Sequence, residues 1–162
     1  MRHILTSVVL LVLLFPALAS GETMDDLVER DGIHYKKYTD VPFTGKTTGK
    51  EQGTFKNGVR DGPWVDYHDN GQLYSKGTYQ DDERDGPWVN YWYNGQLLSK
   101  GTYENGKKDG PWVSYWENGQ LWSHGTHEDG KMDGPWVWYN KDGTGIESLT
   151  GTYNKDGVKI SD

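Results

Sequence analysis

The stretch Asp-Gly-Pro-Trp-Val-Ser-Tyr-Trp-Glu-Asn-Gly-Gln-Leu-Trp-Ser-His-Gly-Thr at 109–126 decides the fold, because most of it recurs along the chain. Its Asp-Gly-Pro-Trp-Val block occurs four times, with the tryptophans 24 residues apart. The Asn-Gly-Gln-Leu block occurs three times with the same period. A fixed period of this length indicates a repeat protein in which each unit is one supersecondary element. The repeated tryptophans are Trp64, Trp88, Trp112 and Trp136.

Two turn signals divide each unit into two strands. One set of Asn-Gly pairs includes Asn70-Gly71, and a second set includes Asn105-Gly106. Asn-Gly favours a two-residue type I′ hairpin, because both central residues need positive φ. The runs between turns, such as residues 64–67, are rich in the aromatic and β-branched residues that favour strands. The sequence therefore predicts an all-β fold, an elongated antiparallel β-meander of tandem 24-residue β-hairpin repeats.

The register of each hairpin follows from its turn. If Asn70-Gly71 forms a two-residue loop, Tyr67 faces Tyr74 and Trp64 faces Gly77. Each tryptophan then lies opposite a glycine, where the indole can cover backbone that has no side chain of its own. We therefore predict structural roles for Trp64, Trp88, Trp112, Trp136, Gly77, Gly101 and Gly125.

The segment before the repeats has the features of an export signal. Residues 1–19 combine a basic start at Arg2, an apolar run and the small residues Ala17 and Ala19. A retained membrane anchor is the alternative, but an apolar run of about a dozen residues is shorter than the roughly 20 that span a bilayer. The predicted domains are a signal peptide at 1–19, a linker at 20–31, a degenerate leading repeat or cap at 32–52, a four-copy repeat domain at 53–153 and a C-terminal tail at 154–162.

Composition restricts the location and the partners. Cleavage after Ala19 predicts a periplasmic or secreted protein, and the absence of cysteine excludes lipoprotein attachment and disulfides. The formal net charge is −7, and loss of Arg2 makes it one unit more negative. Because nucleic-acid recognition needs a basic face, we expect no nucleic-acid partner.

The residue pattern predicts no catalytic, cofactor or metal site. There is no cysteine nucleophile, and the serines at 75, 99 and 123 share one repeat position, which indicates packing. His124 and His127 point to opposite faces of a strand and cannot share a metal ion. The turn aspartates lie two strands apart, roughly 10 Å, which is too far to share one calcium ion. We expect a protein that is not an enzyme and has no small-molecule substrate.

The many aromatic residues are the feature with functional promise. The predicted pairing places Trp92 and Trp116 at strand ends on the face of Trp112, and Trp122 on the opposite face with Tyr74. A one-layer meander cannot bury both faces, so one aromatic column should be partly exposed for contacts. The alternative is that sheet twist lets the aromatic rings cover one another. The candidate contact residues are Trp92, Trp116, Trp122, Tyr74, Tyr67, Tyr91 and Tyr115.

The repeated motif also resembles a known family. Gly-Pro-Trp-Val-x-Tyr-x-x-Asn-Gly-Gln-Leu-x-Ser-x-Gly-Thr-Tyr is complete at 110–127 except for His127, and it resembles the bacterial MORN repeat variant. The resemblance covers about residues 32–153 and implies a fold of β-hairpin repeats. Chains of this kind are grouped with the YwqK-type antitoxin family. MORN arrays are linked to protein scaffolding, dimerisation and phospholipid contact.

Together these features predict a non-enzymatic, exported module for protein–protein interaction or scaffolding. Its contact surface would be the aromatic-rich sheet face, with self-association through open edge strands as a further mode. One alternative is an envelope-associated module that contacts lipid or cell-wall glycan. Another is an antitoxin-like protein that neutralises its partner by binding.

Overall fold

Short strands and one 3-10 helix make up the chain in the computed structural model, which describes residues 21–162. The predicted signal peptide at 1–19 lies outside the described residues. The N-terminal elements are β1 (Glu22–Thr23), η1 (Met24–Asp26), β2 (Leu27–Arg30), β3 (Ile33–Lys36) and β4 (Gly45–Thr48). The repeat strands are β5 (Glu51–Lys56), β6 (Val59–Tyr67), β7 (Leu73–Gln80), β8 (Glu83–Tyr91), β9 (Leu97–Glu104), β10 (Lys107–Lys108), β11 (Gly110–Tyr115), β12 (Leu121–Glu128) and β13 (Lys131–Trp138). The chain ends with β14 (Gly151–Tyr153) and β15 (Lys159–Ser161).

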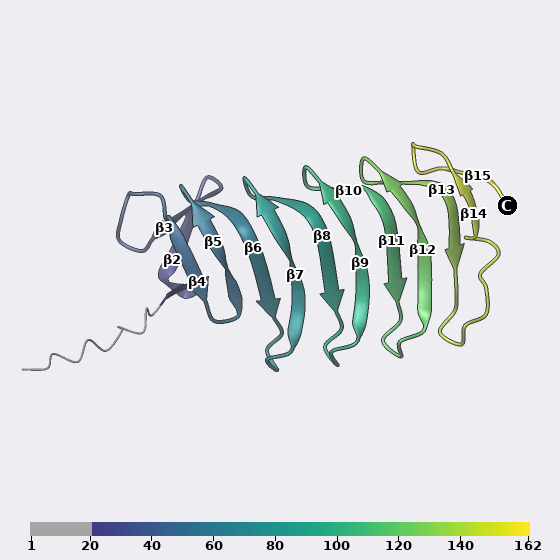
Figure 1. The fold of residues 1–162 in the computed structure, drawn as a ribbon, viewed down its shortest axis with the longest axis horizontal. Helices are drawn as coiled ribbons and strands as arrows, with labels where there is room; N and C mark the ends of the chain where they lie inside the picture. Colours follow the sequence, from purple (N-terminus) through teal and green to yellow (C-terminus); the bar gives the residue numbers. More distant parts are fainter. Residues whose placement is uncertain (1–20) are drawn as a thin grey trace, which may run out of the picture.

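One 13-stranded sheet runs the length of the described chain (Figure 1). Its order is β1-β4-β5-β6-β7-β8-β9-β11-β12-β13-β14-β15, with β10 also paired to β9. All pairs are antiparallel except β1 with β4, and β2 pairs with β3 in a separate hairpin. The predicted all-β meander of hairpin repeats of about 24 residues is confirmed.

A ladder of aromatic rings forms the core along one face of this sheet, which we call the inner face. Its four repeated tryptophans are at most 5% exposed. Neighbouring rings meet edge to face, with centroids 4.9–6.2 Å apart and interplanar angles of 76–89°. Each such pair contributes about 0.5–1.5 kcal/mol beyond area burial. The order along the ladder is Phe55, Trp64, Tyr79, Trp88, Tyr103, Trp112, His127 and Trp136.

Glycines leave the space that these rings occupy. The predicted pairing of tryptophan with glycine is confirmed, since Trp64 pairs with Gly77 and the next two units repeat this pairing. Each indole lies over the glycine of the preceding strand. A Cβ on Gly77 would overlap the ring of Trp88, and a Cβ on Gly101 would overlap Trp112. Each such glycine therefore pairs in the sheet with the tryptophan of one unit and leaves space for the indole ring of the next unit.

The two turn sets differ in geometry. Asn57-Gly58 and Asn105-Gly106 have positive φ at both residues, as a type I′ turn requires, and Asp81-Asp82 adopts the same conformation. At Asn70-Gly71 only the glycine has positive φ, the pattern of a type I turn followed by a left-handed residue. Tyr67 consequently pairs with Leu73 rather than with the predicted Tyr74, and a β-bulge follows.

Asparagine side chains of the first turn set tie each unit to the next. The Asn70 amide donates a hydrogen bond to the carbonyl oxygen of Tyr93 at 2.8 Å, while its Oδ1 accepts one from the backbone N–H of Gln72. Asn94 and Asn118 repeat this arrangement with the carbonyl oxygens of Glu117 and Lys141. Local turn closure and contact between units thus depend on one side chain.

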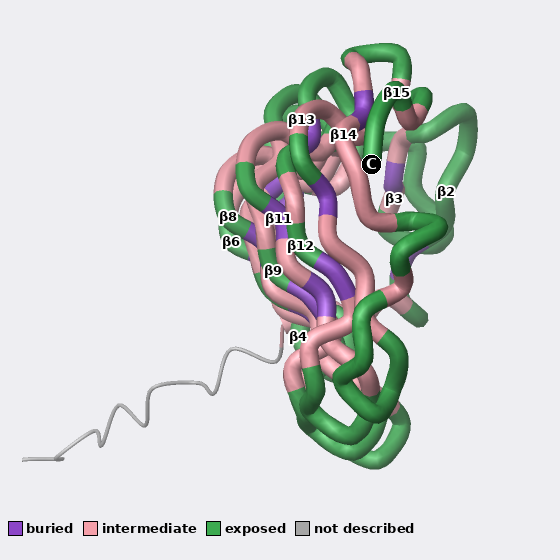
Figure 2. The backbone as a smooth tube through the Cα atoms, turned by 90° about the vertical axis from the view of Figure 1, so that its right-hand side faces the viewer, coloured by how far each residue is buried: buried purple, intermediate pink, exposed green. Residues whose placement is uncertain are grey.

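Both ends of the array are folded where the sequence predicted a linker and a tail. Residues 22–30 form β1, η1 and β2. Leu27 of β2 is buried in the same core cluster as Phe55, which anchors this segment to the array. His34 of β3 packs on Phe55 with ring centroids 4.8 Å apart, so the β2–β3 hairpin lies on the inner side of the bent sheet (Figure 2). Residues 159–161 of the predicted tail pair with β14 as β15.

The edge strands of the sheet are short. β1 has two residues and β15 has three. Short edge strands offer few unpaired backbone groups for another chain to join. The predicted self-association through open edges therefore gains no support from the geometry.

The packing of tryptophan on glycine predicts the effect of a single methyl group. Gly101→Ala should lower the free energy of unfolding by about 1–3 kcal/mol, because Cβ would overlap the Trp112 ring in a filled core. Gly145→Ala is the matched control, since no atom lies within 4 Å of a Cβ there. Urea denaturation measures both, and equal stability of the two variants would contradict the packing described above.

Candidate interaction surface

The predicted tryptophans lie on the inner face, beside the ladder. Trp122 packs on Trp116 with centroids 4.8 Å apart and on Trp138 at 6.0 Å, and Trp138 stacks on Trp136 of the ladder. The prediction that Trp122 lies on the opposite face is therefore wrong. The bulge between β11 and β12 adds a residue to β12, and this breaks the alternation of side chains on which the prediction rested.

Trp92 and Trp116 hold consecutive units together. The indole N–H of Trp92 donates to the carbonyl oxygen of Tyr115 at 3.0 Å, and that of Trp116 donates to Tyr139 at 2.9 Å. His68, at the same repeat position, places its Nε2 3.1 Å from the carbonyl oxygen of Tyr91. All three side chains are half-buried. Their first role is structural, and a further role in partner contact stays a prediction.

The predicted tyrosines do not gather on one surface with these tryptophans. Tyr74 is 44% exposed and lies against His68. Tyr67, Tyr91 and Tyr115 are half-buried, and they share a repeat position with Tyr139, whose ring stacks on His124. Because His124 lies on the face opposite the ladder, this position belongs to that outer face. The seven candidate residues are thus divided between the two faces.

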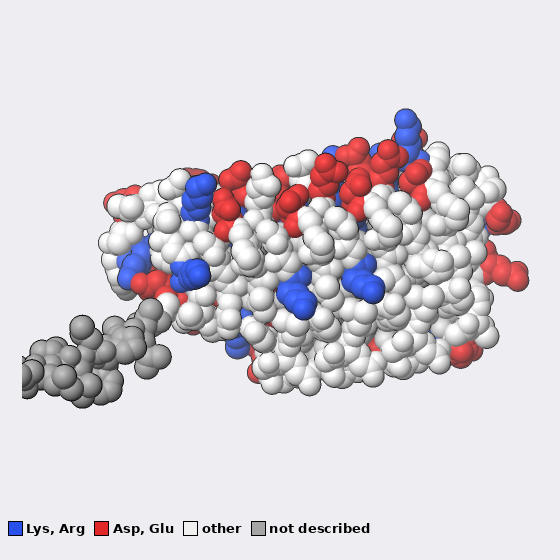
Figure 3. All heavy atoms as spheres, viewed as in Figure 1, with Lys and Arg blue, Asp and Glu red and all other residues white. Residues whose placement is uncertain are grey.

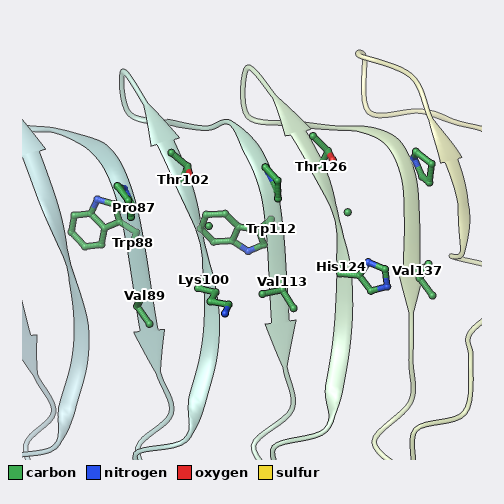
Figure 4. A pocket seen from close by; sticks show the side chains of 14 residues that line it. Pro87, Trp88, Val89, Lys100, Thr102, Trp112, Val113, His124, Thr126 and Val137 are labelled. Atoms are coloured by element: carbon green, nitrogen blue, oxygen red, sulfur yellow. The ribbon is translucent and has the colours of Figure 1, made fainter.

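The outer face carries an apolar hollow that the sequence analysis did not predict (Figure 4). Its volume is about 700 Å³, and it extends from β8 across β9, β11 and β12 to β13. Proline and valine of the last three Pro-Trp-Val blocks line it, together with threonine and glycine of the intervening strands and with Lys100, His124, Trp88 and Trp112. The apolar side chains of the outer face that line the hollow are Pro87, Val89, Pro111, Val113, Pro135 and Val137.

A sequence signal for this hollow exists. In every unit proline and valine flank the buried tryptophan at i−1 and i+1, so strand alternation places both on the other face. The repetition of an apolar pair in four units is the pattern that predicts an apolar outer face.

Charges are arranged around this apolar centre. Figure 3 shows basic side chains in the middle of the face and a row of acidic side chains along the edge of the type I′ turns. Lys76 and Lys100 pair in the sheet with Val89, which lines the hollow. Both lysines are exposed, and neither forms an ion pair within residues 21–162.

Three stretches of this chain match the MORN repeat variant family. The matched residues are 60–81, 84–105 and 108–131, which correspond to three successive units of the array. MORN repeats generally mediate protein or membrane interactions, and the family is generally non-enzymatic. No curated protein matches the chain.

Two further features of the described part of the chain concern metal sites and membrane-spanning helices. Residues 21–162 contain no group of three or more His, Cys, Asp or Glu side chains that could hold a metal ion. No helix among the described residues is long and apolar enough to cross a membrane. The expected absence of catalysis, cofactor and small-molecule substrate stays a prediction.

One ladder position is occupied by an ionisable ring. His127 stands where the two preceding units have Tyr79 and Tyr103, between Trp112 and Trp136, and is 8% exposed. Its Nδ1 has no hydrogen-bond partner. Burial, and then the positive charge of Lys108, lower the pKa of His127 below its usual value. The neutral imidazole is therefore the form that fits the ladder.

This lowered pKa predicts acid sensitivity. When pH falls below about 6.5 the unfolded chain binds a proton at His127 that the native protein excludes, so native stability decreases. His127→Tyr, which restores the usual residue, should be less sensitive to acid than wild type. Thermal melts from about pH 7.5 to about pH 5 measure this, with His124→Tyr on the exposed outer face as control. Parallel pH profiles for wild type and His127→Tyr would contradict the prediction.

Proposed function

We propose that this protein is an exported, non-enzymatic module that binds a partner protein on the outer face of its repeat sheet. The observation that carries the proposal is the apolar hollow of about 700 Å³ between β8 and β13. Exposed apolar surface of this kind on a folded domain marks contact sites for other macromolecules. The match of three units to the MORN repeat variant family supports an interaction role.

The two faces differ in how far their side chains are engaged within the fold, and this difference supports the outer face as the contact surface. On the inner face the aromatic rings contact one another, and the indole N–H groups of Trp92 and Trp116 already donate to backbone carbonyls. On the outer face Pro87, Pro111 and Pro135 are exposed. A partner would gain apolar contact there without displacing any contact of the fold.

The charges on this face indicate the chemistry of the partner. Lys76 and Lys100 form no ion pair among residues 21–162, and the molecule that carries them has a formal net charge of −7. A partner segment that offers apolar side chains to the hollow and a carboxylate to each lysine would be complementary in shape and charge. The rigid spacing of the units would make such a surface a scaffold that needs little ordering on binding.

Export remains part of the proposal because residues 1–19 have the composition of a signal peptide. The partner would then be a periplasmic or secreted protein. Cell fractionation with an antibody to the protein tests this location. Recovery only in the cytosol, with residues 1–19 still attached by mass spectrometry, would overturn it.

A paired substitution tests the outer face. Val89→Glu with Val113→Glu places two carboxylates in the hollow and should weaken partner binding at least about tenfold, because a hot-spot contact becomes a buried charge. Val41→Glu with Val158→Glu is the matched control, since these valines are 73% and 56% exposed and lie outside the hollow. Crosslinking and mass spectrometry identify the partner, and calorimetry then measures affinity.

The outcomes separate the alternatives. Circular dichroism first establishes that all variants keep the β-sheet spectrum. Unchanged affinity of the Val89→Glu, Val113→Glu variant would remove the outer face from the proposal. Sedimentation of the wild-type protein with lipid vesicles or peptidoglycan, without any captured protein, would instead favour an envelope-associated module.

A further inference from the structure

A column of basic side chains runs along the inner face, one from each of three units. Arg60, Arg84 and Lys108 occupy the same position 24 residues apart. Each lies over a ring of the aromatic ladder. Arg60 lies 4.0 Å from the ring centroid of Tyr79, Arg84 lies 4.4 Å from that of Trp88, and Lys108 lies 4.2 Å from that of Trp112.

The first member of this column binds a carboxylate of the chain itself. Asp82 accepts a hydrogen bond from Nε of Arg60, and the backbone N–H of Arg60 points to the same oxygen at 3.4 Å. Nη1 of Arg60 also donates to the Tyr79 hydroxyl at 2.8 Å. The position thus forms a carboxylate site of guanidinium and backbone donors, with the phenol supporting the guanidinium.

The next two units lack this carboxylate. Gly106 and Gly130 stand 24 and 48 residues after Asp82 in the sequence, at the same place in the turn. Gly106 keeps the backbone contact, because its N–H donates to the carbonyl oxygen of Arg84 as that of Asp82 does to Arg60. Only the acidic side chain is replaced.

Arg84 and Lys108 therefore remain without a counter-charge. Neither forms an ion pair within residues 21–162, although Arg84 donates to the Tyr103 hydroxyl at 3.1 Å. Both side chains are half-buried. Burial, and then the positive charge of Arg84, lower the pKa of Lys108. A half-buried cation that has no carboxylate beside it gains from contact with an anion, because a charge-assisted hydrogen bond offsets its lost hydration.

We propose that Arg84 and Lys108 form carboxylate-binding subsites on the inner face, equivalent to the site that Asp82 fills on Arg60. The ligand is a carboxylate, supplied either by a small organic acid or by an acidic side chain of a protein segment. Arg84 would donate from its guanidinium and backbone N–H, and Lys108 from its ammonium group. These subsites lie on the face opposite the apolar hollow and do not depend on the proposed function.

Acidic side chains of the neighbouring turns act against this binding, and Glu83 lies beside the Arg84 subsite, 3.5 Å from a Cβ placed on Gly106. Glu83 is exposed, and at an ionic strength of about 0.15 M charges separated by more than about 8 Å are largely screened. A carboxylate in direct contact with a half-buried guanidinium is screened much less. The experiments below are therefore set at that ionic strength, with chloride as the balancing anion.

Succinate titration followed by NMR tests the subsites directly. The Nε–Hε signal of Arg84 should shift with succinate in wild type and saturate. Arg84→Gln with Lys108→Gln should weaken binding, measured by backbone amide shifts of the adjoining strands, by about tenfold or more, the effect of losing charge-assisted hydrogen bonds. Lys76→Gln with Lys100→Gln removes the same charge from the outer face and should leave binding unchanged. Equal weakening in both double variants would reduce the effect to net charge and overturn the proposal.

A second pair of variants places the missing carboxylate into the chain. Gly106→Asp should pair with Arg84 as Asp82 pairs with Arg60, and so abolish the succinate shift of the Arg84 signal. Gly106→Asn is the matched control, because both residues tolerate the left-handed backbone that Asp82 already adopts. Both are made with Glu83→Gln, since Glu83 lies 3.5 Å from a Cβ at this position. Equal succinate shifts in the Asp and Asn variants would contradict the proposal.

A final comparison distinguishes the two sources of the carboxylate. Succinate and a capped peptide Asp-Ser-Ser-Asp are titrated in parallel, with Asn-Ser-Ser-Asn as the uncharged control. Tighter binding of the acidic peptide assigns the subsites to a protein segment, and tighter binding of succinate assigns them to an organic acid. Shifts of equal size with the uncharged peptide would overturn the carboxylate assignment. The Val89→Glu, Val113→Glu variant should keep the succinate response, because its substitutions lie on the outer face. Failure of the outer-face proposal is therefore distinguishable from failure of the carboxylate subsites.

Discussion

The contact of an indole ring with a glycine of the preceding strand is the interaction on which the structure depends. It lets a single-layer sheet bury large rings without a second layer, because the rings lie flat on backbone that has no side chain. The freed space lets the next aromatic residue meet each indole edge to face, so the ladder becomes continuous. Hydrophobic burial is thereby distributed along an array in which each unit contacts only its neighbours.

The sequence was informative about the fold where a feature repeats and less so where backbone geometry breaks a rule. The 24-residue period, the type I′ turn at Asn57-Gly58 and the Trp64–Gly77 pairing follow from residue types and spacing. The same Asn-Gly dipeptide at 70–71 adopts a different turn, in which the Asn70 side chain binds the Tyr93 carbonyl of the next unit. That single extra residue per hairpin moved Trp122 to the other face.

The candidate site was less predictable than the fold. The sequence predicted contact roles for the large aromatic residues. In the structure, however, the indole N–H of Trp116 donates to a backbone carbonyl, and the ring of Trp122 packs on Trp116. The outer hollow comes from Pro-x-Val pairs that composition alone does not distinguish. The basic column was equally hidden, since its meaning appears only when Asp82 is seen in contact with Arg60. In this repeat protein, the position at which one unit differs from the others, Asp82 against Gly106 and Gly130, is the one that indicates a binding site.

The asparagine bridges between successive turns have a consequence for how such a protein can change in length. Asn70, Asn94 and Asn118 each bind a carbonyl one unit further on, so the spacing is set locally and is the same at every junction. Duplication or loss of one whole unit recreates the same junction, whereas an insertion of any other length breaks it. The array therefore has a fixed spacing of two strands per unit, about 10 Å. Its total length can change during evolution by whole units without a change in any contact between units.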